Sequence, residues 1–242
     1  MSEGLGDPVQ RAMAIECGVL EHAVVDAWMK RIQSVRVTEQ ICDVVLFNEH
    51  PAVITVGRRA QHDGYEVLTE IPHEKVERGG GITYHGPGQL IVYPIIAWQG
   101  LNEQSVRTVT SRLEAWVIAA FGELGIEGRR DERMQGVWVE GNKIASIGLA
   151  FYKWVSRYGI SINVRTERGV VESLRGCGLK EGTSTSLSVL GHTCTISEMT
   201  AALIEHAPHT IQRDLNRATS EDITALKALT DGPSLDEHLR DT

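Results

Sequence analysis

The chain has 242 residues, of which 42% are hydrophobic, and this size and composition fit one large domain with a single core better than two small domains. Its formal net charge of −8 disfavours nucleic acid or an anionic membrane as the main partner, although that total is compatible with a local basic patch. No stretch approaches the roughly 20 apolar residues of a membrane span, and the first ten residues lack the basic and apolar segments of a signal peptide, so we expect a cytoplasmic protein.

The N-terminal third of the chain predicts one helix, two strands and a connecting loop. Apolar residues recur at three- and four-residue spacing over residues 19–36, which is typical of a helix with one buried face. Residues 41–47 and 52–56 are rich in β-branched and aliphatic side chains, and the turn-forming residues 48–51 between them predict that these two strands pair. Residues 60–76 have weak periodicity and several polar breaks, so we expect a surface loop that either borders a site or is simply a long connection.

The middle of the chain predicts a buried strand, a long helix and a β-hairpin. Residues 90–96 form a continuous apolar run, and residues 106–124 carry apolar side chains at helical spacing. Residues 137–139 and 144–147 flank a Glu-Gly-Asn turn at residues 140–142, a combination that predicts a hairpin.

The last third adds a strand and a helix. Residues 156–164 predict the strand, residues 197–206 predict a helix capped at Ser197, and the tail beyond residue 230 looks loosely held. Strands and helices are interspersed without a regular strand-helix-strand repeat. This order predicts an α+β fold in which helices pack against a mixed sheet.

The most unusual segment is residues 77–89, in which five glycines surround one arginine and one histidine. Glycine lets the backbone approach a ligand closely and leaves N–H groups free to point at an acyl oxygen or another anion. A plain glycine-rich turn would not require Arg78, Tyr84 and His85 at its centre, so we favour a binding role. The phosphate-loop pattern GxxxxGK[ST] is absent, and residues 136–143 imitate it without the final Ser or Thr.

Lys143 follows the turn of the predicted hairpin. Strand alternation places it on the same face as Ala145 and Ile147, a face that looks inward. The alternative is an ordinary surface lysine at a hairpin tip. A lysine held in a partly apolar cleft would have a lowered pKa and could exchange protons near neutral pH.

The four cysteines are Cys17, Cys42, Cys177 and Cys194, and none belongs to a CxxC pair or stands beside a histidine at zinc-ligand spacing. We therefore expect neither disulfides nor a metal site. An isolated cysteine is usually buried and inert, but Cys177 has a glycine on each side, which exposes a thiol and permits a tight backbone. A nearby ammonium group would stabilise its thiolate, the species that attacks carbonyl carbon.

These segments resemble the lipoyl(octanoyl) transferase family, which shares its fold with lipoate ligases and biotin protein ligases. The resemblance spans about residues 15–190 and implies a single catalytic domain at 15–215, with a largely antiparallel mixed sheet, between an N-terminal extension (1–14) and a C-terminal tail (216–242). Its motifs are Thr55-Val56-Gly57-Arg58-Arg59, residues 78–89, Gly136-Val137-Trp138-Val139, Lys143-Ile144-Ala145-Ser146-Ile147-Gly148 and Cys177-Gly178-Leu179.

The resemblance implies an octanoyltransferase in which Cys177 becomes the acyl thioester and Lys143 is its acid/base partner. No ATP, metal or other cofactor is needed, because exchange between thioesters is nearly balanced and amide formation on an acceptor lysine draws the reaction forward. The acyl pocket would be lined by residues from three segments, namely Arg78, Gly79, Gly80, Gly81, Ile82, Thr83, Tyr84, His85, Ser146, Ile147, Gly148, Gly159, Ile160 and Ser161.

The resemblance also implies the partners. The donor would be octanoyl-acyl carrier protein and the acceptor a lipoyl domain of a 2-oxoacid dehydrogenase or the glycine cleavage H protein, with no nucleic acid or membrane and with the enzyme as a monomer. Acyl carrier proteins are acidic, so arginines near Arg58 would suit a donor-docking face. The candidates, each of which could also be an ordinary solvated side chain, are Arg58, Arg59, Arg129, Arg130 and Arg133.

This chain departs from the family pattern at three places: Tyr158-Gly159 replaces His-Gly, Gly176 replaces a proline, and Ser184-Thr185-Ser186-Leu187 replaces Val-Thr-Ser-Leu. Loss of a pocket histidine could change the acyl-chain preference or the acceptor. Two alternatives to the transferase stay open. One is an ATP-dependent lipoate or biotin-type ligase, which would need no cysteine, and the other is a non-catalytic acyl-binding paralogue that keeps the pocket.

Overall fold

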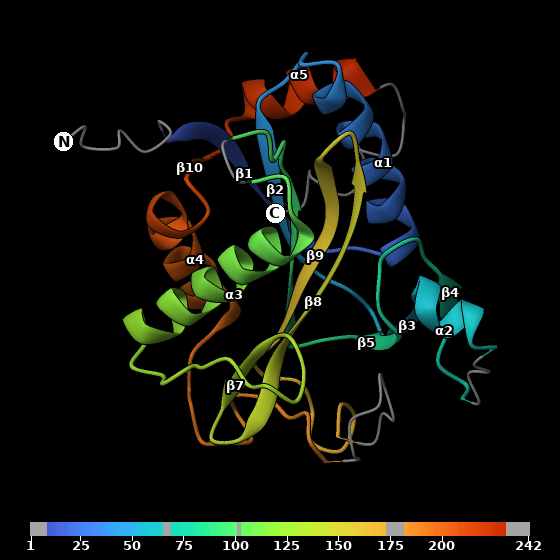
Figure 1. Ribbon diagram of the computed structural model, residues 1–242, viewed down its shortest axis with the longest axis vertical. Coiled ribbons are helices and arrows are strands. Elements are labelled where there is room, and N and C mark those ends of the chain that lie inside the picture. Colours follow the sequence, from blue (N-terminus) through green and yellow to red (C-terminus); the bar gives the residue numbers. More distant parts are fainter. Residues whose placement is uncertain (1–8, 65–68, 101–102, 173–181, 231–242) are drawn as a thin grey trace.

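The computed structural model of the protein describes residues 9–64, 69–100, 103–172 and 182–230. A seven-stranded sheet crosses the molecule, and a small three-stranded sheet lies to one side of it (Figure 1). In their order across the large sheet the strands are β10 (Arg213–Arg217), β1 (Gln10–Val19), β2 (Asp43–Glu49), β6 (Gln89–Ile95), β9 (Val155–Asn163), β8 (Asn142–Tyr152) and β7 (Val137–Val139). Strand β1 is parallel to both of its neighbours and the other pairs of this sheet are antiparallel, which confirms the expected mixed, largely antiparallel sheet.

Helices cover both faces of the large sheet (Figure 1). Helices α3 (Val106–Glu123) and α4 (Ile196–Thr210) pack on one face, and α1 (His22–Val37) and α5 (Ser220–Thr230) on the other. Alternate residues of β6 serve the two faces: Val92 belongs to the core with Trp116 of α3, and Tyr93 to the core with Trp28 of α1. Because both faces are covered, β6 is buried along its whole length, which explains its continuous apolar run.

Most of the predicted elements are present. The helices expected at 19–36 and 106–124 are α1 and α3, and the strands expected at 90–96 and 156–164 are β6 and β9. The predicted hairpin is β7 and β8. Its turn residues Glu140 and Gly141 have φ values of 51° and 80°, as a two-residue hairpin turn requires.

The cap of the last predicted helix is Thr195 and not Ser197. The Thr195 side chain accepts a hydrogen bond from the Glu198 backbone N–H, while the Glu198 side chain accepts one from the Thr195 N–H. Ser197 therefore lies inside α4. None of the helices within the described ranges is long and apolar enough to cross a membrane.

The expected pairing of residues 41–47 with 52–56 is wrong. Strand β2 lies in the large sheet, whereas β3 (Val53–Val56) lies in the small one, between β4 (His73–Lys75) and β5 (Ile82–His85). The chain leaves the large sheet at His50, which is fully buried. The His50 ring contacts the Leu20 carbonyl oxygen at 2.6 Å and the Tyr93 hydroxyl at 3.0 Å. Because these partners hold the corner inside the protein, the two strands diverge instead of forming a hairpin.

Residues 60–76, expected as a loop, contain regular structure at both ends. Helix α2 (Arg58–His62) begins just before this stretch, and β4 lies near its end. At the termini, β1 starts at Gln10 and α5 packs against α1, so the described structure reaches beyond residues 15 and 215 in both directions. The domain boundaries themselves remain a prediction, and the tail beyond residue 230 lies outside the described residues.

Candidate active site

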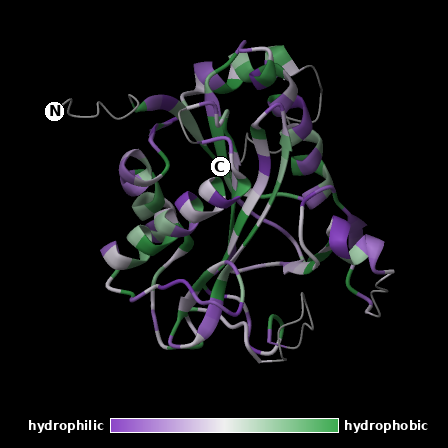
Figure 2. Cartoon of the chain, viewed as in Figure 1, coloured by the Kyte–Doolittle hydropathy of each residue, from purple (hydrophilic) through white to green (hydrophobic). Residues whose placement is uncertain are grey.

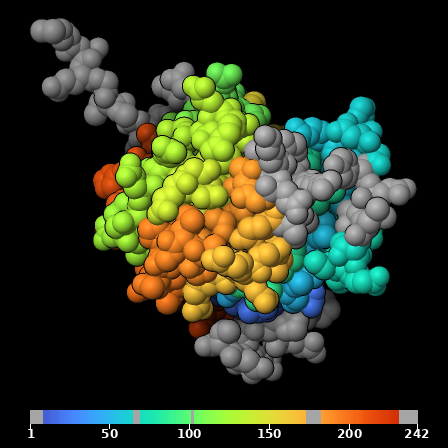
Figure 3. Space-filling view, turned by 90° about the horizontal axis from the view of Figure 1, so that it is seen from below, coloured from blue at the N-terminus to red at the C-terminus, as the bar shows by residue number. Residues whose placement is uncertain are grey.

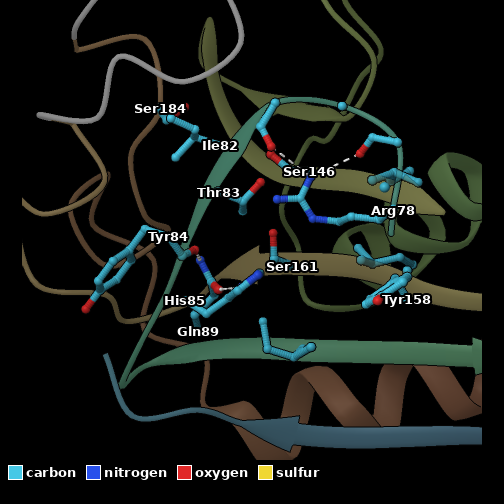
Figure 4. A pocket seen from close by; sticks show the side chains of 18 of the residues that line it. Arg78, Ile82, Thr83, Tyr84, His85, Gln89, Ser146, Tyr158, Ser161 and Ser184 are labelled. Carbon is cyan, nitrogen blue, oxygen red and sulfur yellow. Dashed lines mark hydrogen bonds between the residues drawn. The ribbon is translucent and has the colours of Figure 1, made fainter. Parts of the chain in front are cut away.

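A cavity of about 220 Å³ lies between the large sheet and the small sheet. One wall comes from β8 and β9, and the other from β5 and the glycine-rich segment before it (Figure 4). The structure brings the three predicted segments of the acyl pocket together in the lining of this one cavity, where Lys143 joins them. The lining residues from these segments are Arg78, Gly79, Gly80, Gly81, Ile82, Thr83, Tyr84, His85, Ser146, Ile147, Gly148, Gly159, Ile160 and Ser161.

Arg78 holds the glycine-rich segment in place. Its side chain is buried, with Nη1 donating to the carbonyl oxygens of Gly79 and Gly81 at 3.0 Å each. Nη2 donates to the Thr55 carbonyl oxygen at 2.9 Å and to the Thr55 hydroxyl at 2.8 Å. A Cβ on Gly57 would lie 2.6 Å from the Gly80 carbonyl oxygen, so only glycine allows this close packing. The guanidinium group thus joins the loop to β3, and both Nη1 and Nη2 donate to backbone carbonyl oxygens of the protein itself.

Replacing Arg78 with methionine is therefore expected to lower the free energy of unfolding by about 2–4 kcal/mol, because the buried carbonyl groups lose charged donors. Urea unfolding of the variant and of the parent protein measures this difference. The matched control is Arg58→Met, at an exposed arginine of α2, which should change stability by less than about 0.5 kcal/mol. Equal losses from the two substitutions would contradict this role of Arg78.

His85 lies on the floor of the cavity and is neutral. Gln89 donates through Nε2 to the Asn163 Oδ1 at 2.7 Å, so its Oε1 faces the His85 Nδ1 at 2.8 Å, which must carry the proton (Figure 4). The other ring nitrogen of His85 accepts from the Thr55 hydroxyl at 3.2 Å. Burial, together with the neighbouring His50, holds the pKa of His85 well below its usual range. A floor without charge suits an apolar ligand.

Lys143 is buried near the start of β8 and paired through its backbone to residues far along the chain. Its N–H donates to the Thr183 carbonyl oxygen at 2.9 Å, and its carbonyl accepts from the Thr185 N–H at 3.2 Å. Gly136 leaves room for the lysine, since a Cβ there would lie 2.7 Å from the Lys143 Cε. Lys143 lines the cavity, as its predicted inward position requires. Ala145, expected on the same face, packs into the core beneath α3 and α4.

Cys177 lies within residues 173–181, outside the described residues. The two residues that flank this segment are hydrogen bonded to each other, the Gly182 N–H donating to the Glu172 carbonyl oxygen at 2.9 Å. The Glu172 carboxylate also accepts from the Thr185 hydroxyl at 2.7 Å. Because Thr185 pairs with Lys143, both described ends of the segment lie near the lysine. Figure 3 shows the same neighbourhood on the surface, where the yellow-green region of β7 lies beside the orange segment that follows Gly182.

The other three cysteines have thiols that are poorly suited to attack. Burial raises the pKa of Cys17 to about 12, and burial also raises the pKa of Cys42 and of Cys194. None of these three lines the cavity. Within the described ranges, no group of three or more His, Cys, Asp or Glu residues is placed to hold a metal ion.

The candidate arginines form two groups, one at α2 beside the cavity and one in the segment before β7. Arg58 and Arg59 begin α2, a strongly hydrophilic helix at the edge of the molecule, and Arg59 lines the cavity (Figure 2). On the other side, Arg130 pairs with Glu114 and Arg133 with Asp131, each at 2.8 Å. These acidic partners offset the charge of the second group, so the clearer excess of positive charge lies on α2.

Sequence reasoning missed several residues that shape the cavity. Asn163, Tyr93 and His22 all line it, and His22 stacks on His85 with ring centroids 6.1 Å apart. They come from β6, β9 and the start of α1, where each looks like an ordinary buried position. A polar residue within an otherwise apolar strand, such as Asn163, is the one signal that could have indicated the cavity.

Comparison with known proteins gives consistent results. Residues 23–207 match the family described as the lipoyl protein ligase A/B catalytic domain. An octanoyltransferase of Syntrophobacter fumaroxidans is 38% identical over 227 residues, which are 90% of this chain and 98% of that protein. An octanoyltransferase of Synechococcus elongatus is 31% identical over 223 residues, which are 90% and 95% of the two chains.

Solved structures share the fold at much lower identity. A bi-partite lipoate protein ligase of Thermoplasma acidophilum has a TM-score of 0.62 at 14% identity, covering 94% of this chain and 95% of that one. Lipoate-protein ligase A bound with ATP gives a TM-score of 0.62 at 14% identity, covering 94% and 96%.

Proposed function

The chain belongs to the family of the lipoyl protein ligase A/B catalytic domain, and on this premise we propose that it is an octanoyltransferase of protein lipoylation. One observation carries the proposal: relatives named octanoyltransferase align with nine-tenths of this chain and with almost their whole length. The protein is accordingly an acyltransferase, and its acceptor is a lipoyl domain. We infer that the enzyme acts as a monomer.

The chemical step that we propose is a relay through Cys177. Lys143 takes the thiol proton, and the thiolate attacks the carbonyl carbon of the donor thioester; the donor thiolate leaves and receives the proton from Lys143. The acceptor lysine amine then attacks the Cys177 thioester, an amide bond forms, the C–S bond breaks, and the amine proton passes through Lys143 to the cysteine sulfur. No ATP enters, because the donor thioester already carries the activated acyl group. The position of Lys143 beside both described ends of residues 173–181 supports this pairing.

The cavity suits the acyl chain of such a substrate. Its glycines allow close approach, and its floor carries a neutral histidine. Apolar atoms of Ile82, Ile147 and Ile160 contribute to the lining. An octanoyl chain can therefore lie in the cavity without the burial of an unpaired charge.

Transfer without ATP is the test of this function. The protein is incubated with octanoyl-acyl carrier protein and a purified lipoyl domain, and the lipoyl domain is weighed by mass spectrometry. We expect the lipoyl domain to gain the mass of one octanoyl group on a lysine. Modification only when ATP and free octanoate are supplied would identify a ligase instead, and no modification under either condition would identify an acyl-binding protein without turnover.

We infer that the donor is an acyl carrier protein that docks at the rim near α2, where Arg58 and Arg59 are exposed. Carrier proteins are acidic, and opposite charges across a rim speed association and strengthen it at low salt. Arg58→Glu should raise the KM for octanoyl-acyl carrier protein by about tenfold at low ionic strength, an effect that salt diminishes. Steady-state kinetics with the carrier and with a small uncharged octanoyl thioester separate docking from chemistry.

The matched control is Arg31→Glu, the same charge change at an exposed arginine of α1 that does not line the cavity. We expect it to leave the KM near that of the parent protein. Equal effects of the two substitutions, or an equal loss with the small thioester, would contradict a docking role for α2.

A further inference from the structure

Tyr158 breaks the side-chain alternation of β9 beside the cavity. Its φ value is 56°, in the left-handed region that a tyrosine rarely adopts. In the register of the sheet Tyr158 stands opposite Leu149, yet Leu149 packs against the core beneath α3 and α4 while Tyr158 belongs to the core beneath α1. The left-handed backbone thus turns the Tyr158 ring onto the α1 face of the sheet, where Tyr158 and Gly159 both line the cavity. Such strain persists only where surrounding contacts hold it.

The contacts that hold Tyr158 fix both its ring and its hydroxyl. The hydroxyl donates to Asp26 Oδ1 on α1 at 2.8 Å and accepts from the Glu77 N–H at 3.3 Å. The ring meets Tyr93 edge-to-face with centroids 6.4 Å apart. Asp26 is held in turn by Lys30 at 2.6 Å. Because the side chain is buried and anchored at both ends, it cannot swing aside to admit a longer ligand.

Tyr158 and the proposed reaction centre lie at opposite ends of the cavity. Ser184, which pairs with Lys143, lies at one end, and Tyr158 lies at the other (Figure 4). The stretch of β8 from Lys143 to Gly148 is about 16 Å long. Gly148 pairs across the sheet with Gly159, the residue next to Tyr158. An extended eight-carbon chain spans roughly 9 Å, which leaves room for the lysine side chain and the thioester but little more.

We propose that Tyr158 is the end wall of the acyl cavity and sets the longest chain that the enzyme accepts. This rests on the proposed function, because it assumes that the carbonyl end of the chain lies at Lys143. The terminal methyl group of an octanoyl chain then meets the Tyr158 ring. Each additional methylene of a longer chain has to displace a side chain that two hydrogen bonds and an aromatic neighbour hold in place.

Acylation rates with a series of acyl carrier proteins test the proposal. The enzyme is mixed with hexanoyl-, octanoyl-, decanoyl- and dodecanoyl-acyl carrier protein, and the initial rate of acyl adduct formation is measured by intact mass. In Tyr158→Ala the ratio of the dodecanoyl rate to the octanoyl rate should rise by about tenfold or more, since each methylene accommodated in an apolar pocket is worth at least that much. In Tyr158→Phe, which keeps the ring, the order of the four rates should match the parent protein.

The matched control is Tyr152→Ala, the same change at an exposed tyrosine of the β8–β9 hairpin, which should leave the four rates unchanged. If Tyr158→Ala proves too unstable to assay, Tyr158→Leu removes the ring, keeps an apolar side chain, and should shift the preference toward decanoyl. An unaltered chain-length order in the shortened variants, or a phenylalanine variant that accepts dodecanoyl as readily as the alanine variant, overturns the proposal. No adduct of any length in the parent protein would instead refute the proposed function.

Discussion

Replacing Cys177 with serine is expected to lower kcat/KM for octanoyl transfer by about a thousandfold or more. A serine hydroxyl is far less acidic than a thiol, so Lys143, the proposed proton acceptor, cannot produce the anion that attacks the donor thioester. The ester that would form is also a poorer acyl donor than a thioester. The loss is measured as the rate of octanoyl transfer to a lipoyl domain, which is monitored through the mass of that domain over time.

The other cysteines provide the control for this substitution. Cys42 lies outside the cavity, and partial burial of its thiol together with the nearby Asp43 carboxylate raises its pKa. Cys42→Ser is therefore expected to transfer octanoyl at the parent rate. A Cys177→Ser enzyme that retains most of its activity would show that the acyl group does not pass through this residue.

Replacing Lys143 with methionine should slow acylation by about a hundredfold at neutral pH, and by much less at alkaline pH. An ammonium group near Cys177 favours the thiolate and so lowers the thiol pKa; without it the pKa rises toward the ordinary value of about 8.5. The thiolate fraction of the variant is then small at neutral pH and recovers as the pH passes that value. The rate of octanoyl adduct formation across this pH range measures the shift, and methionine nearly preserves the volume of the buried side chain.

Lys153→Met is the control for the loss of a lysine, because Lys153 is an exposed residue of the turn between β8 and β9. We expect its pH profile to coincide with that of the parent protein. Profiles of Lys143→Met and the parent that run parallel at all pH values would remove Lys143 from the acid/base role and leave it a structural residue of β8.

Much of the fold could be predicted from the sequence because local patterns determine it. The apolar spacing in α1 and α3, the continuous apolar run of β6 and the Glu-Gly-Asn turn of the hairpin all depend on neighbouring residues. The separation of β2 from β3 could not be predicted in this way. It depends on the contacts of His50 with Leu20 and Tyr93, which lie far from it in the sequence.

The candidate site, like the fold, could be predicted from the sequence only in part. The three predicted segments line one cavity, and the glycines of their motifs let the backbone itself form part of its wall. The sequence could not reveal that Arg78 binds the carbonyls of its own loop, since a guanidinium group serves ligands and backbone equally well. Nor could it reveal the left-handed backbone at Tyr158, which depends on packing against Tyr93 and on the hydrogen bond to Asp26.

The intact mass of the protein after incubation with octanoyl-acyl carrier protein, in the absence of ATP, tests the central claim most directly. The relay through Cys177 predicts a mass increase of one octanoyl group, its removal by hydroxylamine, and its absence from Cys177→Ala. An adduct that forms only when ATP is added, or that persists in Cys177→Ala, would contradict the proposed chemistry.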